Sequence, residues 1–413
     1  MQNVQLQLLA CLKAYRLGQA QAEYTALDTG DWPALYQLAA QQKLSAVVYE
    51  TLYRSADFCR SNAALAARWK RETILQVSGQ AIRTQKLLRL TGGLDAAGVG
   101  YAVVKGALCR QLYEKTDLRP SGDEDILIHR ADFSRCSEVL AACGMRLNTG
   151  SAEDDVTHWL DAETGLHVEL HTALFSSARR EDVLLNEWFS QALSCTVAAA
   201  VAGGSAQSLQ HSDHFLFLVC HALKHFISGG FGVRTLCDIV TYAERFQNEI
   251  DHERVSRLLQ QVNGRIFLDQ IFAVGRDVLA FDMAACGWAL SAPDDAQALL
   301  DDCLAAGIYG QSSMSRRHSA SLVLEAAEGG GRPNLLHAAF PPRKKLLSRY
   351  PVLARAPVLL PVVWLRRLGS YGLEVVRTAG KGNSPGESIA MGKKRTEMMI
   401  KYGVIPKNKA KDP

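Results

Sequence analysis

Residues 122–128 read GDEDILI, so two aspartates open an apolar run. Residues 125–128 have the length and composition of a β-strand. Asp123 and Asp125 are two residues apart, and side chains at that spacing point to the same face of a strand. Carboxylate oxygens bind hard cations, and two such ions about 3.5 to 4 Å apart stabilise both the attacking and the leaving oxygen of a nucleotidyl transfer. The stretch therefore predicts a divalent-metal site.

Another strand is expected just upstream of this pair. Residues 98–104 read GVGYAVV, a glycine-bounded apolar run of strand length. Residues 107–113 predict a short helix. Residues 131–143 predict a further helix, because apolar side chains recur there at three- and four-residue spacing. The paired aspartates therefore lie where short strands alternate with helices.

A third acid follows about forty residues later along the chain. Residues 156–160 and 166–170 predict two short strands joined by a polar, glycine-containing hairpin loop. Glu169 lies on the second strand, where it is placed to complete a cage of three carboxylates. His167 and His171 flank it at alternating positions, so all three side chains share one face. Either histidine can orient the acid or touch an acceptor, and we expect one of them to be only structural.

Together these segments resemble the uncharacterised nucleotidyltransferase family, a branch of the polymerase beta-type superfamily. The specific matches are VVKGAL (103–108), LRPSGDEDILI (118–128) and HVELHTAL (167–174). Looser similarity covers DWPALYQLAAQQKLSAVVYETL (31–52), HALKHFISGGFGVRTLCDI (221–239) and RYPVLARAPVLLPVVWLRRL (349–368). The similarity therefore extends over most of the chain, although only the first three motifs are specific.

The resemblance implies an α+β fold with a polymerase beta-type nucleotidyltransferase core, a small mixed sheet with helices. Helical segments are expected on both sides of this core, since the sequence reads as helical before Leu90 and again from about His211. We expect an N-terminal helical segment, the catalytic core, a helical domain and a basic C-terminal extension. Their bounds are 1–92, 93–200, 201–330 and 331–413.

The resemblance also implies the activity. A nucleoside triphosphate such as ATP binds through two Mg²⁺ (or Mn²⁺) ions held by Asp123, Asp125 and Glu169. A nucleophile of an acceptor, which is a sugar, peptide, protein or RNA, attacks the α-phosphorus and pyrophosphate leaves. Two alternatives stay open: a catalytically weak nucleotide- or partner-binding module of a biosynthetic pathway, and an RNA-modifying, toxin-like transferase.

Four residues near the aspartates are candidate nucleotide contacts: Lys105, Gly106, Arg119 and Gly122. Gly106 permits a close approach of the backbone to phosphate. Lys105 closes the first strand beside this glycine, but an ordinary surface lysine explains it equally well. Arg119 has the planar donor group that suits phosphate oxygens, or it anchors the loop.

Further candidates for the acceptor or the nucleotide pocket lie in the second helical region. Lys224, Arg234 and Asp238 resemble positions of the family's helical segment, which commonly lines the pocket, and His225 lies beside them. His225 also shares one helical face with His214 and His221. This histidine face favours packing of the helix against the sheet over a zinc site, because HALKH lacks the glutamate of the metalloprotease motif.

Two residues depart from the superfamily pattern. Ala107 follows Gly106 where a serine is usual, so backbone N–H groups are expected to serve the phosphates. Glu124 stands between the aspartates, where the residue is normally apolar. A buried, unpaired carboxylate is costly, so we expect Glu124 to lie near solvent or to find a basic partner.

Charge is distributed unevenly along the chain. Residues 330–413 contain 17 basic and 4 acidic residues, which gives 17 − 4 = +13, whereas the whole chain carries +4. The apolar stretch 351–365 is interrupted by Arg355, Pro357 and Pro361 and is too short to cross a bilayer. We expect this region to bind anionic lipid at the membrane interface, to attract nucleic acid, or to be a solvated tail over an acidic body. The last stretch, from about Lys381, is expected to be mobile.

Cellular location is indicated by two further features. Residues 1–18 lack the basic segment, long apolar run and cleavage site of a signal peptide, so export is not expected. Ten cysteines are scattered without a Cys-x2-Cys pair, as expected for reduced cysteines that pack as small hydrophobes. We therefore expect a cytoplasmic protein, with peripheral membrane association as one option.

Overall fold

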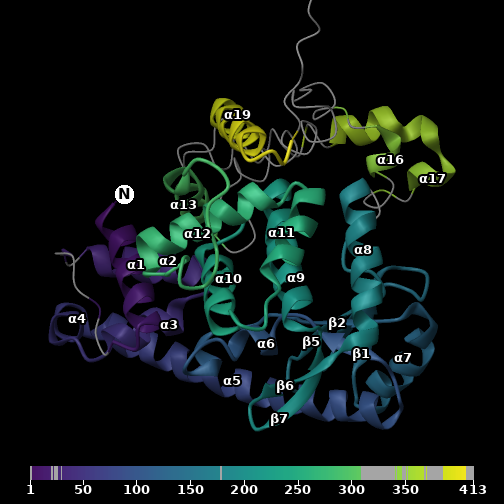
Figure 1. Ribbon diagram of the computed structural model, residues 1–413, viewed down its shortest axis with the longest axis horizontal. Helices are drawn as coiled ribbons and strands as arrows, with labels where there is room; N and C mark the ends of the chain where they lie inside the picture. The colour runs from purple at the N-terminus through teal and green to yellow at the C-terminus, as the bar shows by residue number, and fades with distance from the viewer. Residues whose placement is uncertain are drawn as a thin grey trace, which may run out of the picture. The chain divides into compact units, whose positions relative to one another are not determined.

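Figure 1 shows a computed structural model of the chain. It describes residues 2–19, 22, 27–28, 30–176, 179–307, 340, 342–346, 350, 352–366, 369 and 385–405. The chain divides into two compact units, one formed by residues 1–221 with 234–296 and the other by 222–233 with 297–413. The division into four segments at 92, 200 and 330 stays a prediction.

The first unit contains a seven-stranded mixed sheet in the order β3-β4-β5-β2-β1-β7-β6. The pairs β2–β5 and β1–β7 are parallel, and the other neighbours are antiparallel. The bounds are β1 Tyr101–Val103, β2 Glu124–Ile128, β3 Arg146–Thr149, β4 Val156–Leu160, β5 His167–His171, β6 Val197–Val201 and β7 Gly204–Ser208. The α+β class and the mixed sheet are confirmed, and the polymerase beta-type core stays a prediction.

Helices fill most of the rest of the described chain. Their bounds in order are α1 Asn3–Arg16, α2 Asp31–Gln41, α3 Ser45–Leu52, α4 Ala56–Ser61, α5 Ala63–Ala96, α6 Ala107–Arg110, α7 Phe133–Ala142, α8 Arg180–Ala192, α9 His211–Ser228, α10 Val233–Arg245, α11 His252–Gln261, α12 Arg265–Leu279, α13 Ala296–Ala306, α16 Arg343–Leu346, α17 Val352–Arg355 and α19 Pro385–Lys401. Short 3-10 turns are η1 Thr116–Leu118, η2 Arg130–Asp132, η3 Leu193–Cys195 and η4 Pro357–Leu359.

One face of the sheet carries the apolar core. Alternate residues of β2 and β5, Ile126, Ile128, Val168 and Leu170, are buried together on this face. Apolar side chains of α5 and α7 pack on the same cluster, and Figure 1 shows these two helices on one side of the sheet. The intervening residues of β2, β4 and β5 point to the opposite face, which is where the predicted acids are found.

The N-terminal helices form an aromatic cluster against the start of α5. Trp69 of α5 is fully buried, and its ring lies 5.7 Å from Phe58 and 5.1 Å from Tyr36. The Trp69 indole N–H donates to Ser45 O at 2.9 Å. The long helix α5 therefore joins the N-terminal helices to the sheet core.

The second unit has described packing of its own around Phe226. The Arg395 side chain of α19 donates to Phe226 O, and the ring of Tyr402 lies 5.8 Å from that of Phe226. The expectation that the chain is mobile from about Lys381 is therefore wrong for α19, which buries Met399. Residues 381–384 and 406–413 lie outside the described part of the chain.

Membrane spans and cysteine pairing were both addressed by the sequence. Among the described residues, no helix is both long enough and apolar enough to span a membrane. All ten cysteines are free, and seven of them are buried, which agrees with their expected use as small hydrophobes.

Candidate active site

Parallel pairing of β2 with β5 brings two of the predicted acids together. Asp125 is the register partner of Glu169, although they are separated by forty-four positions in sequence (169 − 125). His171 joins them from the end of β5, and one ligand atom from each of the three side chains lies within 4.8 Å of the others. Asp125 and His171 are buried and Glu169 is half-buried. Sheet register therefore assembles two carboxylates and an imidazole on the face opposite the core.

His171 lies between the two carboxylates. Its Nε2 is 3.1 Å from Asp125 Oδ1 and 3.5 Å from Glu169 Oε2. Burial alone would lower the pKa of His171, but hydrogen bonds to both carboxylates raise it to about 9. The hydrogen bond from His171 is also the main cause that lowers the pKa of Glu169. A protonated imidazole thus offsets part of the negative charge of the pair.

Asp123 lies just before β2 and is half-buried. Burial raises the pKa of Asp123, the charges of Asp125 and Glu169 raise it further, and Lys105 opposes them. The oxygens of Asp123 are not part of the 4.8 Å cluster among the described residues. The predicted set of three carboxylates therefore stays a prediction, with Asp125 and Glu169 side by side and Asp123 within their electrostatic field.

The donor atoms of this cluster fit a hard divalent cation. Mg²⁺ and Mn²⁺ prefer carboxylate oxygens, which Asp125 and Glu169 supply from adjacent strands. Burial and then the charges of Asp125 and Glu169 raise the pKa of Asp123, and a bound cation would oppose this rise. His158, on β4 opposite Glu169, adds an imidazole whose Nδ1 lies 3.5 Å from Glu169 Oε1. Sequence reasoning missed His158, although the alternation along β4 places it on the same face.

Gly106 and Ala107 form a tight turn directly above Glu124. Gly106 has φ +52°, and a Cβ at this position would overlap Glu124 Oε2 and lie 2.9 Å from Asp123 O. Only glycine fits this turn without displacement of its neighbours. The backbone N–H of Ala107 donates to Glu124 Oε2 at 2.6 Å. One of the backbone donors expected to serve the phosphates is therefore used by Glu124.

Glu124 is 2% exposed and has several partners inside the protein. Besides the Ala107 N–H, it accepts from Ser121 Oγ at 2.8 Å, and Arg110 Nη2 lies 3.5 Å from Glu124 Oε1. The expected basic partner is confirmed, whereas the alternative position near solvent is wrong. Arg110 is itself 1% exposed and donates to Thr84 Oγ1 at 2.8 Å. Sequence reasoning missed Arg110 because nothing in its local pattern marks it as a buried cation.

Arg119 forms a buried ion pair with Asp238. Its Nε donates to Asp238 Oδ1 at 3.0 Å and its Nη2 to Asp238 Oδ2 at 2.5 Å. Tyr113 donates its hydroxyl to the same Oδ1 at 2.9 Å. Arg234 Nη1 donates to Pro120 O at 2.8 Å. These contacts support the interpretation that Arg119 anchors the loop. Asp238 and Arg234 help to hold the same loop, through Arg119 and through Pro120 O.

Lys105 extends from the end of β1 toward the acids. Its Nζ lies 3.4 Å from His221 Nε2, and it is the cation that opposes the raised pKa of Asp123. His214 lies seven residues before His221 in α9. Its Nε2 is 2.9 Å from Val104 O. His214 is buried, which confirms the packing role expected for it. Both contacts dock α9 onto the end of β1.

The other candidates are less informative. Gly122 and His167 are exposed, at the loop before β2 and at the first position of β5. Lys224 is exposed and His225 is half-buried; both belong to the second unit. Their predicted roles stay predictions.

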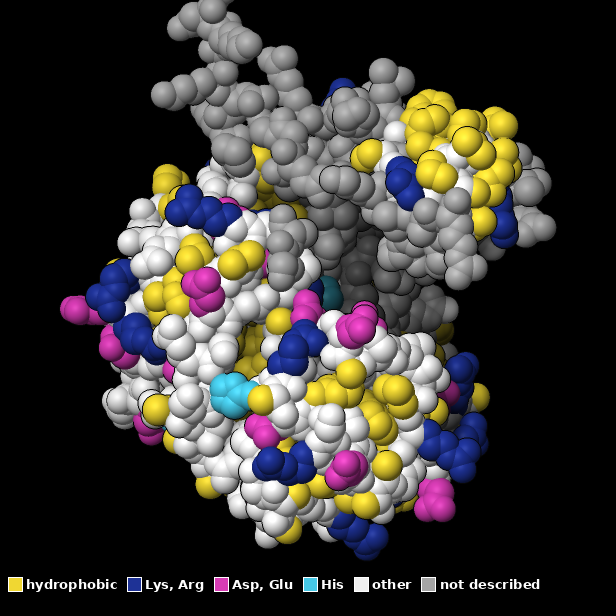
Figure 2. Space-filling view, turned by 90° about the vertical axis from the view of Figure 1, so that its right-hand side faces the viewer, with side chains coloured by type: hydrophobic (Ala, Val, Ile, Leu, Met, Phe, Trp, Pro, Cys, Tyr) yellow, Lys and Arg dark blue, Asp and Glu magenta, His cyan; other side chains and the backbone are white. Residues whose placement is uncertain are grey.

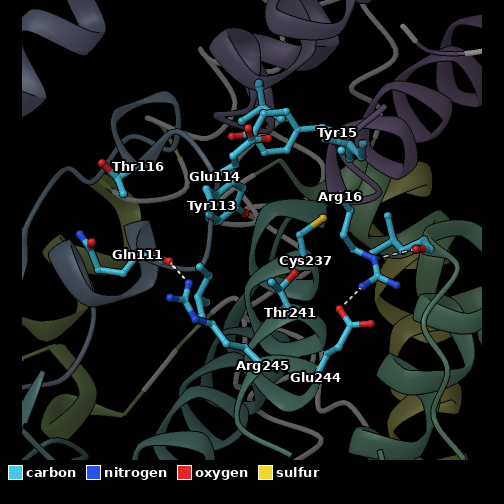
Figure 3. A pocket seen from close by; sticks show the side chains of 15 residues that line it. Tyr15, Arg16, Gln111, Tyr113, Glu114, Thr116, Cys237, Thr241, Glu244 and Arg245 are labelled. Carbon is cyan, nitrogen blue, oxygen red and sulfur yellow. Dashed lines mark hydrogen bonds and ion pairs between the residues drawn. The ribbon is translucent and has the colours of Figure 1, made fainter. Parts of the chain in front are cut away.

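A cavity of about 510 Å³ lies beyond the C-terminal end of α6 (Figure 3). Three of its charged side chains have partners: Arg16 pairs with Glu244, and Arg245 donates to Gln111 O. Tyr113 contributes to its wall. The remaining lining residues are Leu12, Tyr15, Gly18, Val47, Leu112, Glu114, Thr116, Cys237, Thr241 and Leu279. The carboxylate cluster does not contribute to this cavity.

Carboxylates held side by side can bind the divalent ions that a metal-dependent phosphoryl- or nucleotidyl-transfer enzyme uses. Comparison with protein families gives the corresponding assignment, because residues 28–279 match the family described as "Uncharacterised nucleotidyltransferase". The chain belongs to this family, as the resemblance in its motifs predicted. No curated protein and no solved structure matches the chain. Membership supports nucleotidyl transfer as the general activity, with a nucleoside triphosphate as substrate.

Proposed function

We propose that this protein transfers a nucleoside monophosphate from a nucleoside triphosphate to an acceptor, with Asp123, Asp125 and Glu169 as the metal-binding carboxylates. The observation that carries the proposal is the register of β2 with β5, which aligns Asp125 with Glu169. Bound Mg²⁺ or Mn²⁺ would neutralise the triphosphate and stabilise charge on the reacting oxygens. The acceptor nucleophile forms the new bond to the α-phosphorus as the bond to pyrophosphate breaks.

Residues around the cluster have supporting roles in this proposal. His171 holds the side chains of Asp125 and Glu169 in position through its hydrogen bonds. Lys105 is the candidate for a direct phosphate contact. Its positive charge acts on Asp123, whose pKa it lowers. Gly106 keeps the backbone turn close to Glu124 and Asp123, in a space that has no room for a side chain. The acceptor, a sugar, peptide, protein or RNA, is left open.

Label transfer tests this function. Purified full-length protein, Mg²⁺ and α-labelled nucleoside triphosphates are incubated with a panel of acceptors, and labelled product and pyrophosphate are measured. Asp125→Asn and Glu169→Gln should each reduce transfer at least about a hundredfold, as removal of a group that stabilises transition-state charge does. Glu163→Gln is the matched control, because Glu163 is exposed in the β4–β5 loop. Unchanged transfer in Glu169→Gln, or none by the wild type with any acceptor, contradicts the proposal.

A second candidate, a nucleotide-binding module with weak chemistry, is favoured by two specific contacts. The Ala107 N–H is occupied by Glu124, and the Arg119 guanidinium is occupied by Asp238. Two of the groups available for phosphates are therefore used internally. Calorimetry separates the two candidates, because metal-dependent nucleotide binding without any turnover favours the module and turnover excludes it.

A further inference from the structure

A short helical segment of the second unit is apolar on both of its faces. It covers η4 and the helical residues 360–366. One face packs inward: Val363 is 6% exposed and joins Leu346 and Leu353 in a small core. Leu359, Leu360 and Trp364 pack against this core, and Phe340 meets the Trp364 ring edge-on at 5.5 Å. The segment therefore has a defined inner side.

Its outer side is also aliphatic. Val358 is 83% exposed, Val362 is 59% exposed and Leu365 is 69% exposed. These three residues are spaced i, i+4 and i+7, so they share one face of the helix. Val352 of α17, 48% exposed, adds to the exposed aliphatic surface. Figure 2 shows a group of hydrophobic side chains with basic side chains beside it. A helix that is apolar all round is expected to be covered by an apolar medium.

The net charge of the surrounding residues indicates which partner covers this aliphatic face. Residues 340–367 contain seven basic residues, Arg343, Lys344, Lys345, Arg349, Arg355, Arg366 and Arg367, and no acidic one. A second copy of the chain would bring together two segments that both carry this positive charge, which disfavours self-association. Binding of single-stranded nucleic acid relies on aromatic stacking surfaces. The outer face here carries Val358, Val362 and Leu365, and the exposed Phe340 is held edge-on against Trp364. An anionic lipid surface satisfies both the charge and the aliphatic face.

We propose that residues 352–366 form a peripheral membrane anchor, with Val358, Val362 and Leu365 inserted at the headgroup boundary of an anionic bilayer. The fifteen residues 352–366 are too short to cross the membrane, which needs about 20. An interfacial helix instead lies in the plane and buries its apolar face about 5 to 10 Å deep. The exposed Arg366 side chain follows Leu365 directly, within reach of anionic headgroups.

Vesicle co-sedimentation tests the anchor on the full-length protein. Wild type is mixed with vesicles of phosphatidylcholine alone or of phosphatidylcholine with phosphatidylserine, at low and high salt. We expect binding to the anionic vesicles that weakens with salt. The variant Val358→Ser/Val362→Ser/Leu365→Ser should bind at least about tenfold more weakly, since insertion scales with buried apolar area.

A matched control comes from α5, which also exposes three large aliphatic side chains. Ile74, Leu75 and Ile82 are 54%, 66% and 55% exposed. Their substitution by serine should leave vesicle binding unchanged. Circular dichroism and the thermal midpoint check that both triple variants are folded.

Several results would overturn the anchor. These are an absence of binding to anionic vesicles, equal binding to neutral and anionic vesicles, or equal binding by the wild type and the Val358 triple variant. Light scattering adds a further test: a wild-type dimer that this triple variant converts to monomer would show that the face is a protein interface. Loss of vesicle binding in the α5 control would show that general surface hydrophobicity is responsible.

Discussion

Glu124 is a buried charge that supports the turn beside the metal-binding acids. It accepts from the Ala107 N–H and from Ser121 Oγ, and Arg110 supplies the opposite charge. Burial raises the pKa of Glu124 and lowers that of Arg110. In both groups, removal from water disfavours the charged form. Such a pair adds little net stability, but the loss of one member leaves a buried charge without compensation. The carboxylate and the Gly106 turn therefore constrain each other.

Substitution of Gly106 tests this mutual constraint. A Cβ at Gly106 would overlap the Glu124 carboxylate and lie 2.9 Å from Asp123 O, at φ +52°. We expect Gly106→Ala to lower the free energy of unfolding by about 3 kcal/mol or more, from backbone strain together with overpacking. Nucleotidyl transfer should fall as well, because the turn and Asp123 shift together. Chemical denaturation measures the first effect and label transfer the second.

Gly98 provides the control for backbone strain alone. It also has positive φ, +63°, but an added Cβ would meet no atom within 4 Å. Gly98→Ala should therefore cost about 1 to 2 kcal/mol, the penalty for an L-residue in this region. Equal destabilisation by the two substitutions would show that the contact with Glu124 contributes nothing.

The strands that carry the site could be predicted from the sequence, and the outer strands could not. β2, β4 and β5 show a compact apolar run or alternation, and all three were expected at nearly their observed bounds. β6 and β7 read VAAAV and GSAQS, in which alanine, serine and glycine give no strand signal. β3, RLNT, is exposed throughout and equally unmarked. Strand propensity therefore identified the centre of the sheet and missed its edges.

The contacts between elements were predictable only in part. Alternation placed Glu169 and His171 on one face of β5, but the sequence does not specify that β2 pairs with β5 in parallel. It gave a basic partner for Glu124 as one of two alternatives, without identifying Arg110, which comes from α6. The role of Arg119 was left between phosphate contact and loop anchor, because Asp238 lies more than a hundred residues away. Local sequence patterns therefore do not predict which strands pair or which side chains that are far apart in sequence meet.

Helix α9 contributes a pH-sensitive contact through His214. Burial lowers the pKa of His214 to about 4, while its hydrogen bond to Val104 O acts in the opposite direction. The unfolded chain, with a histidine pKa of about 6.5, binds the proton more readily than the folded chain. Stability from this group is therefore complete above about pH 6.5 and is lost as the pH falls toward 4, by about 3 kcal/mol in all.

Urea denaturation at a series of pH values measures this effect. His214→Gln should have a shallower loss of stability between pH 6.5 and 4 than the wild type. Val219→Ala creates a cavity beside the same helix, because Val219 is fully buried. It should lower the free energy of unfolding by about 2 kcal/mol equally at every pH. If the curves of the wild type and His214→Gln run parallel over this range, His214 is not the titrating group.

Metal binding should stabilise the first unit as a whole, because the ligands come from two strands that only the folded sheet brings together. A ligand that binds the native state alone adds RT ln(1 + [L]/Kd), about 2.7 kcal/mol at a hundredfold excess over Kd. For a unit of this size, that corresponds to a rise of about 5 °C in the thermal midpoint. Mg²⁺ or Mn²⁺ should produce the rise in the wild type, and EDTA should reverse it.

The same variants locate the source of this stabilisation without any acceptor. Glu169→Gln should lose most of the metal-induced rise, because an amide replaces one of the two carboxylates that share the cluster. Glu163→Gln, changed in the adjacent loop, should keep it. A rise of equal size in Glu169→Gln would place the cation elsewhere. A wild type that gains no stability from either ion would contradict the metal site itself, independently of whether an acceptor for transfer has been found.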